Sequence, residues 1–319
     1  MAITDFDKYF MNFPPINREN DFAAFWKEAT AEIKKIPLEL SAKKNQKSSA
    51  HFTHVSLSFR SFMKTQITGE LLMPKHSENA PVVIVVHDYN RKSEINEGLL
   101  DASLAYFFIV MRGHSIISEP ADDEETDTAS PGYLIENILD KETYYIKAVY
   151  LDVLRSIDAL RLVTKLNCSN IGIIGKGLGA AAGLFASVNS KRVAALVLDT
   201  PSFCYLPLSQ NKSEDDAAKE INDYISKSKT LKKKIKLNLS YFDALNFSDM
   251  LNCPVLATVG FKDVLAPPEC VFALFNHLAC EKTLEIYPDE GNTAGGDEQF
   301  RKSISWVKDR ILSQQEPAI

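Results

Sequence analysis

Apolar runs of strand length alternate with stretches of helical period from residue 81 to the end of the sequence. The runs are apolar on both faces, at residues 81–89, 105–111, 171–175, 193–199, 254–260 and 283–288. The clearest helical stretches between and after them are 141–164, 178–188, 268–278 and 298–312. Strands that are apolar on both faces belong in a parallel sheet covered by helices. The sequence therefore predicts an α/β fold, a mostly parallel sheet with helices on both faces.

The first 80 residues follow a different pattern. Residues 21–36 have a helical period, residues 41–50 are polar and suggest a loop, and residues 51–73 alternate as antiparallel strands do. The apolar side of the helix comprises Phe22, Phe25, Trp26, Ala29 and Ile33. We expect a single domain over residues 1–319. It would carry a helical and antiparallel extension at about 1–75 and a polar helical insertion at about 208–250.

Charge and cysteine content limit the possible partners. The chain has 36 basic and 42 acidic residues, a formal net charge of −6, which argues against nucleic acid or an anionic membrane as a partner. No apolar run approaches the roughly 18 residues of a membrane span, and no signal peptide is recognisable, so we expect a cytoplasmic protein. The lysine-rich stretch 227–236 is interpreted as a solvated helix face. The five cysteines form no CxxC pair, which predicts reduced thiols and no metal site.

The stretch "IGIIGKGLGAAAGLFAS" at 171–187 combines a strand, a glycine-rich turn and a small-residue helix. One interpretation is a dinucleotide fingerprint, because Gly175, Gly177 and Ala180 fit G-x-G-x-x-[G/A]. Asp199, at the end of the next run, would then bind the ribose. In this interpretation the glycines allow a pyrophosphate to approach the helix N-terminus.

The other interpretation is a nucleophile elbow, G-x-S-x-G, without its serine. Gly175 and Gly179 are then the flanking glycines, and Gly177 stands where the nucleophile would be. Asp263 follows a later strand, as the acid of a Ser…Asp…His order would. Residues 289–296, after the last strand, contain no histidine.

Long segments distributed over nearly the whole chain decide between these interpretations. They are "DFAAFWKEATAEIKKIP", "HDYN", "MRGHS", "PGYLIENILDKETYYIKAVYLDVLRSIDAL", "LSYFDALNFSDM" and "GFKDVLAPPECVFALFNHL". They resemble the acetyl xylan esterase and cephalosporin C deacetylase family of α/β-hydrolases. The resemblance implies an α/β-hydrolase fold, carbohydrate esterase activity, no cofactor and a homo-oligomer. It argues against dinucleotide binding, because a nucleotide-binding turn usually opens its sheet and this one follows several strands.

The resemblance implies a role for individual residues of this sequence. Asp263 matches the acid of the family's triad, Gly177 stands at its nucleophile position, and Asn292 stands at its base position. The oxyanion and pocket motifs map onto the remaining site residues, which are Asp88 and Tyr89 of "HDY", Arg112 and His114 of "RGH", and Leu178 after the elbow position. The family has H-G-Y, R-G-Q and glutamine at the corresponding places.

These differences change what the site can do. Glycine has no atom that can attack a carbonyl, and asparagine does not shuttle a proton as imidazole does. A carboxylate at Asp88 opposes the stabilisation of an oxyanion. We therefore expect a non-hydrolytic pseudoenzyme with a binding or structural role, whose partner is a small acetylated or carbohydrate ligand. The alternative is a carboxylic-ester hydrolase that deacetylates sugars or small esters through a non-standard site.

Overall fold

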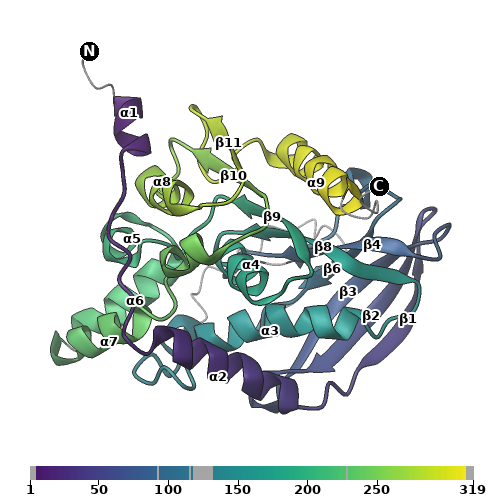
Figure 1. The fold of residues 1–319 in the computed structure, drawn as a ribbon, viewed down its shortest axis with the longest axis horizontal. Helices are drawn as coiled ribbons and strands as arrows, with labels where there is room; N and C mark the ends of the chain where they lie inside the picture. The colour runs from purple at the N-terminus through teal and green to yellow at the C-terminus, as the bar shows by residue number, and fades with distance from the viewer. Residues whose placement is uncertain (1–4, 92, 115, 118–131, 228, 314–319) are drawn as a thin grey trace.

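The computed structural model describes residues 5–91, 93–114, 116–117, 132–227 and 229–313. Within these ranges nine strands form one sheet, in the order β1-β2-β3-β6-β4-β8-β9-β10-β11 (Figure 1). Its parallel part comprises β4 (Ala80–Val86), β6 (Ala105–Ile109), β8 (Leu166–Lys176), β9 (Val193–Asp199), β10 (Val255–Gly260) and β11 (Lys282–Tyr287). Each overlaps one of the six predicted runs, so the apolar pattern located these strands to within a few residues.

Helices cover both faces of this sheet, as predicted. Three of them, α2 (Phe22–Lys35), α3 (Tyr145–Leu160) and α4 (Leu178–Asn189), share one large core with the strands. On the opposite face α9 (Gly296–Ser313) packs through Ile304, Val307 and Ile311 (Figure 1). The stripe of apolar residues predicted for the first of these helices is buried at all five positions. A further helix, α8 (Pro268–His277), lies beside β10.

The antiparallel strands β2 (Phe52–Arg60) and β3 (Gln66–Pro74) extend the same sheet, with β3 pairing antiparallel to β6. The expectation of a loop at residues 41–50 is wrong, because β1 (Ser41–Ser48) pairs with β2 at the sheet edge. An edge strand needs no apolar face, and lysines such as Lys43 and Lys44 protect an edge from further pairing. Because β1 is polar at nearly every position, its sequence lacks the apolar pattern by which the other strands were predicted. The short strands β5 (Ser93–Glu94) and β7 (Ile116–Ile117) pair separately.

The region of the expected polar insertion is helical, with α5 (Leu206–Lys212), α6 (Asp216–Lys227) and α7 (Lys232–Leu239). Short 3-10 turns occur at Phe62–Lys64, Glu97–Leu99, Tyr133–Ile135, Lys229–Leu231 and Ala244–Met250, and α1 (Asp5–Phe10) packs on α8. An acidic stretch of the sequence at residues 118–132, which we expect to be an exposed loop, lies outside the described residues except for its last residue. The division into one domain with an extension and an insertion stays a prediction.

The five cysteine thiols are free, four buried and Cys280 half-buried. Across the described ranges, no helix combines the length and the apolar character that a bilayer crossing requires.

Candidate active-site region

Four predicted site residues follow the carboxyl ends of strands in the parallel part of the sheet. Asp88 follows β4, Gly177 follows β8, Asp263 follows β10 and Asn292 follows β11. Because β4 and β8 are neighbours, as are β10 and β11, the four residues form two groups. Ligands of α/β sheets bind at this end of the strands.

The first group is built around the turn between β8 and α4. Gly177 has φ 54° and ψ −119°, a backbone conformation that side chains rarely adopt. Its N–H donates to the Asp199 carbonyl oxygen at 3.0 Å, which fixes the turn against β9. A Cβ atom placed on Gly177 would overlap the Asp88 carboxylate. The space for a side chain at this turn is therefore already filled from the neighbouring strand.

Asp88 directs its carboxylate at two backbone donors. Its Oδ1 accepts from the N–H of Leu178 at 2.7 Å and from the N–H of Tyr89 at 2.8 Å. Burial raises the pKa of Asp88 to about 6, even though these two hydrogen bonds act in the opposite direction. Two convergent backbone N–H groups at a strand-to-helix turn form the type of pocket that stabilises an oxyanion. Here a carboxylate of the chain itself occupies that pocket.

Tyr89 points away from this pair of donors and toward the helical region 206–239. Its hydroxyl donates to Glu220 Oε1 at 2.8 Å and accepts from the N–H of Tyr133. Glu220, on α6, also accepts from the backbone N–H groups of Gly132 and Leu134. Burial and the neighbouring Glu220 raise the pKa of Tyr89 above its usual range. Tyr89 therefore anchors α6 over the site.

The second group is built around Asp263. Its Oδ1 accepts from the N–H of Leu265 at 2.8 Å and of Ala266 at 2.9 Å. Its Oδ2 lies 3.5 Å from Asn292 Nδ2, which also donates to Thr200 Oγ1 at 3.3 Å. Burial raises the pKa of Asp263. The Asn292 amide can therefore donate a hydrogen bond to the Asp263 carboxylate, but it cannot exchange a proton with it.

Lys176 connects the two groups. Its Nζ donates to the Asn292 carbonyl oxygen at 2.9 Å and to Asp199 Oδ2 at 3.1 Å. Asp199 also accepts from Thr258 Oγ1 at 2.7 Å. The dinucleotide interpretation needs Asp199 for a ribose and the first N–H of α4 for a phosphate. Since Asp88 holds that N–H and two side chains hold Asp199, this geometry argues against it.

The remaining predicted residues support the backbone around the site. Arg112 forms a bidentate pair with Asp152 at 2.7 and 2.8 Å. His114 accepts from the N–H of Asn90 at 3.1 Å, with its other ring nitrogen beside the Arg112 carbonyl oxygen. His87 makes two comparable backbone contacts, and burial lowers its pKa to about 4. All four imidazole nitrogens thus contact backbone groups.

Comparison with known proteins now places the chain. The family model described as acetyl xylan esterase (AXE1) matches residues 1–310. The chain belongs to this family. It is 26% identical over 307 residues to acetyl esterase Axe7A of Xylanibacter ruminicola, covering 93% of this chain and 69% of that protein.

Two solved structures of acetyl xylan esterases share the fold. The enzyme from Paenibacillus sp. R4 aligns with a TM-score of 0.86 at 24% identity, over 96% of this chain and 100% of that one. Acetyl xylan esterase 1 from Thermoanaerobacterium sp. JW/SL YS485 aligns with a TM-score of 0.84 at 19% identity, over 99% and 100%. The α/β-hydrolase architecture predicted from the sequence is therefore confirmed.

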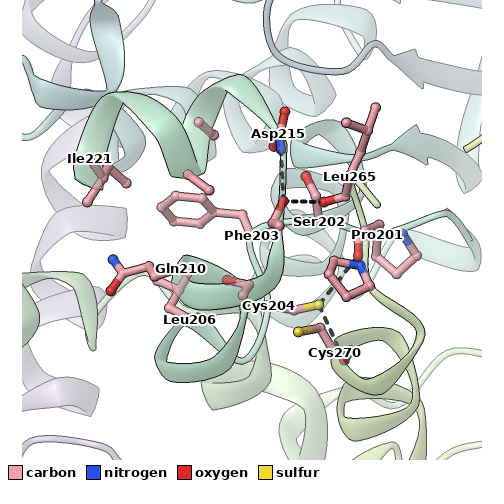
Figure 2. Close-up of a pocket in the computed structure, with 16 residues that line it drawn as sticks. Pro201, Ser202, Phe203, Cys204, Leu206, Gln210, Asp215, Ile221, Leu265 and Cys270 are labelled. Carbon is pink, nitrogen blue, oxygen red and sulfur yellow. Dashed lines mark hydrogen bonds between the residues drawn. The ribbon is translucent and has the colours of Figure 1, made fainter. Parts of the chain in front are cut away.

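In this protein, which belongs to the acetyl xylan esterase family, the space beside the site is small. A cavity of about 20 Å³ lies between the segments after β9 and β10 and the start of α6, and Figure 2 shows Ser202, Asp215 and Leu265 around it. One ordered water needs about 10–15 Å³, so the cavity holds about one. Burial and the nearby Asp88 raise the pKa of Asp215 to about 8. A sugar ring does not fit without movement of these segments.

Sequence reasoning missed two buried acids at this site, Asp215 and Glu220. Both lie in the region interpreted as a polar insertion, where acids are common and alternate with lysines. The one available signal is the helical period of α6, which places Glu220 on the same side as Ala217 and Ile221. Among the described residues, no group of three or more His, Cys, Asp or Glu is arranged to hold a metal ion.

Proposed function

We propose that this chain is a non-hydrolytic member of the acetyl xylan esterase family, a pseudoenzyme with a binding or structural role. The observation that carries the proposal is the Asp88 carboxylate on the N–H groups of Leu178 and Tyr89. An oxyanion that forms on an ester carbonyl needs these donors, and a carboxylate that already accepts both denies it the position. Its negative charge would also repel the developing one.

The other two positions support the same proposal independently. At Gly177 there is neither a nucleophilic atom nor space for one, because Asp88 fills the volume next to its Cα. At Asn292 the amide contacts Asp263, but an amide does not accept the proton of an attacking alcohol. Each change alone would lower hydrolysis by orders of magnitude.

Family membership and the similarity to an acetyl esterase favour the alternative, an active carboxylic-ester hydrolase with a non-standard site. Such a site would need a serine or cysteine beside an available imidazole. The ring nitrogens of His87 and His114 contact backbone groups instead. This arrangement is the reason for ranking the alternative second.

The ligand proposed for the remaining site is a small acetylated compound or carbohydrate, which would require the segments around the 20 Å³ cavity to open. We also propose a homo-oligomer, on the family resemblance alone. Static light scattering checks it, and a mass of 35.6 kDa, equal to one chain, would contradict it.

Hydrolysis of p-nitrophenyl acetate, combined with labelling by a fluorophosphonate probe, tests the main proposal. We expect turnover equal to the buffer rate and no covalent label, with the Xylanibacter ruminicola acetyl esterase as the active control. Turnover that survives removal of trace contaminants, together with a labelled residue, would establish the esterase alternative. Mass spectrometry of the labelled peptide would then identify the nucleophile.

A further inference from the structure

Two of the five cysteines lie just before neighbouring strands, at the end of the sheet opposite to the candidate active-site region. The strands β10 and β11 run parallel, side by side in Figure 1, and their register pairs Val255 with Lys282. Cys253 and Cys280 each lie two residues before this pair, so the same register places them opposite each other. The two chains still touch there, because the N–H of Val255 donates to the Glu281 carbonyl oxygen at 2.9 Å.

The two thiols also face the same core. Cys253 belongs to the large core that includes α2, α3 and α4, and Cys280 packs against it. Burial, together with the neighbouring Cys280 thiol, raises the pKa of Cys253 to about 12. The Cα atoms of a disulfide lie about 4.4–6.8 Å apart, and neighbouring strands lie about 4.8 Å apart. The register therefore suits a bond between these two residues without rearrangement of the sheet.

An oxidant reaches one member of the pair more easily than the other. The Cys280 side chain is half-buried, whereas Cys253 is 9% exposed. A small oxidant from solvent therefore meets Cys280 first, with Cys253 behind it as the second thiol. Cys204 and Cys270 are neighbours too, with Cys204 Sγ 3.5 Å from the Cys270 carbonyl oxygen (Figure 2). Their side chains are 0% and 1% exposed, so we expect this second pair to stay reduced.

We propose that Cys253 and Cys280 form a disulfide when the protein is exposed to hydrogen peroxide. The Cys280 thiolate attacks one peroxide oxygen, the O–O bond breaks, hydroxide leaves, and the sulfur becomes a sulfenic acid. The Cys253 thiolate then attacks the Cys280 sulfur, the S–O bond breaks, and a second hydroxide leaves. The two hydroxides take up the two thiol protons. Two thiols thus lose two electrons to one peroxide, giving one disulfide and two waters.

This bond would close the loop 253–280, which contains β10, the Asp263 turn and α8. Such a cross-link restricts the unfolded chain, so oxidation should raise the melting temperature by about 5 °C for a loop of this length. Burial raises the pKa of Cys280 as well, and only the thiolate reacts. The oxidation should therefore be slow at neutral pH and need an excess of peroxide.

Intact-mass measurement and peptide mapping of the peroxide-treated wild-type chain test this proposal. We expect a mass lower by two hydrogen atoms and a linked peptide pair that joins Cys253 to Cys280. Dithiothreitol should reverse both, together with the rise of about 5 °C in melting temperature. A disulfide between Cys204 and Cys270 in its place, a sulfinic acid at Cys280 without a disulfide, or unchanged thiols would overturn the proposal.

Serine variants separate the disulfide from other oxidation. Peroxide should leave the melting temperatures of Cys253→Ser and Cys280→Ser unchanged, and each is compared with the same variant before treatment, so its own stability cancels. Cys253→Ser should accumulate a sulfenic acid at Cys280 that dimedone traps, because the second thiol is missing. Cys168→Ser, outside the pair, should gain about 5 °C as wild type does. A gain in Cys280→Ser equal to that of wild type would contradict the assignment.

Discussion

The turns at Asp263 and at Gly177 both follow strands of the same sheet. They differ in where the acceptor for their backbone N–H groups comes from. Asp263 accepts N–H groups two and three residues further along, so its carboxylate also closes a local turn. The N–H of Leu178, at the Gly177 turn, is met by Asp88 from a different strand. The acid thus has a structural use that is independent of chemistry, whereas the nucleophile position holds no side chain of its own.

This difference indicates which parts of a hydrolase site can change without loss of the fold. A residue that satisfies backbone donors is costly to replace, because each buried N–H left unpaired costs about 1–3 kcal/mol. A serine at a strained turn is the opposite case, because the strained conformation itself costs on the order of 1–3 kcal/mol and glycine avoids most of it. The variants below test this asymmetry, beginning with the largest expected effect.

Gly177→Ser should produce the largest loss of stability at this site. The new Cβ would overlap the Asp88 carboxylate and would also occupy a backbone conformation at φ 54°. Overpacking and backbone strain together predict a loss of about 3–4 kcal/mol in the free energy of unfolding. Urea denaturation measures it, and p-nitrophenyl acetate turnover should remain at the buffer rate.

The matched double variant Gly177→Ser/Asp88→Gly separates the two causes. Asp88→Gly alone leaves the Leu178 and Tyr89 N–H groups without their acceptor, so it is measured as well. The coupling free energy of this double-mutant cycle should equal the overpacking part, about half of the loss, and the remainder is backbone strain. A Gly177→Ser protein as stable as wild type, or one that hydrolyses the ester briskly, would contradict the view that Asp88 fills the nucleophile's space.

Asp88→Asn should raise stability at alkaline pH. The pKa of Asp88 rises from 3.8 to about 6 on folding, mainly through burial. A carboxyl group with a raised folded-state pKa contributes stability that is fully present below about pH 4 and is lost as pH rises through about 6. Asparagine keeps an acceptor for both N–H groups without the charge. Its advantage should therefore reach about 2–3 kcal/mol at pH 8 and vanish near pH 4.

Thermal unfolding of the two proteins between pH 4 and pH 8 measures this difference. Asp243, whose pKa is also raised to about 6 by burial, titrates in the same range but is common to both proteins and cancels. Asp215 does not cancel, because the Asp88 charge helps to raise its pKa to about 8, and its relief in Asp88→Asn adds to the advantage of the variant near pH 8. A constant difference across the range would indicate that the Asp88 carboxylate is not penalised by burial. A difference that grows toward low pH would mean that folding lowers the pKa of Asp88 instead of raising it.

Asp263→Ala should cost less, about 2 kcal/mol, because two backbone N–H groups lose their acceptor while a carboxylate that burial penalises is also removed. Asp263→Asn is the matched control. It retains an Oδ1 acceptor and should stay within about 0.5 kcal/mol of wild type. If the alanine variant is as stable as the asparagine variant, the local hydrogen bonds do not hold the turn.

The sequence could predict where the strands end, but not which side chains and backbone groups contact each other at those ends. Continuous apolar runs located β4, β6, β8, β9, β10 and β11, since burial on both faces leaves a compositional trace. The polar edge strand β1 leaves none and was missed. That a carboxylate follows β4 was readable from Asp88, but its capture of the Leu178 N–H depends on two turns that are 90 residues apart. Glu220 and Asp215 were hidden because buried and solvated acids look alike in a helical region.

Asn292→His is expected to have the smallest effect and probes the Asp263 side directly. An imidazole at this position would stand beside Asp263, which raises the pKa of a histidine, so the variant should gain a titrating signal above the ordinary 6.5 in NMR. Stability should change by less than about 1 kcal/mol, because the amide contact it replaces is long at 3.5 Å. Turnover should remain at the buffer rate, since residue 177 is still a glycine and Asp88 still fills the space beside it. A rise in turnover on this change alone would mean that a nucleophile other than residue 177 serves the site, and would return the esterase alternative to first place.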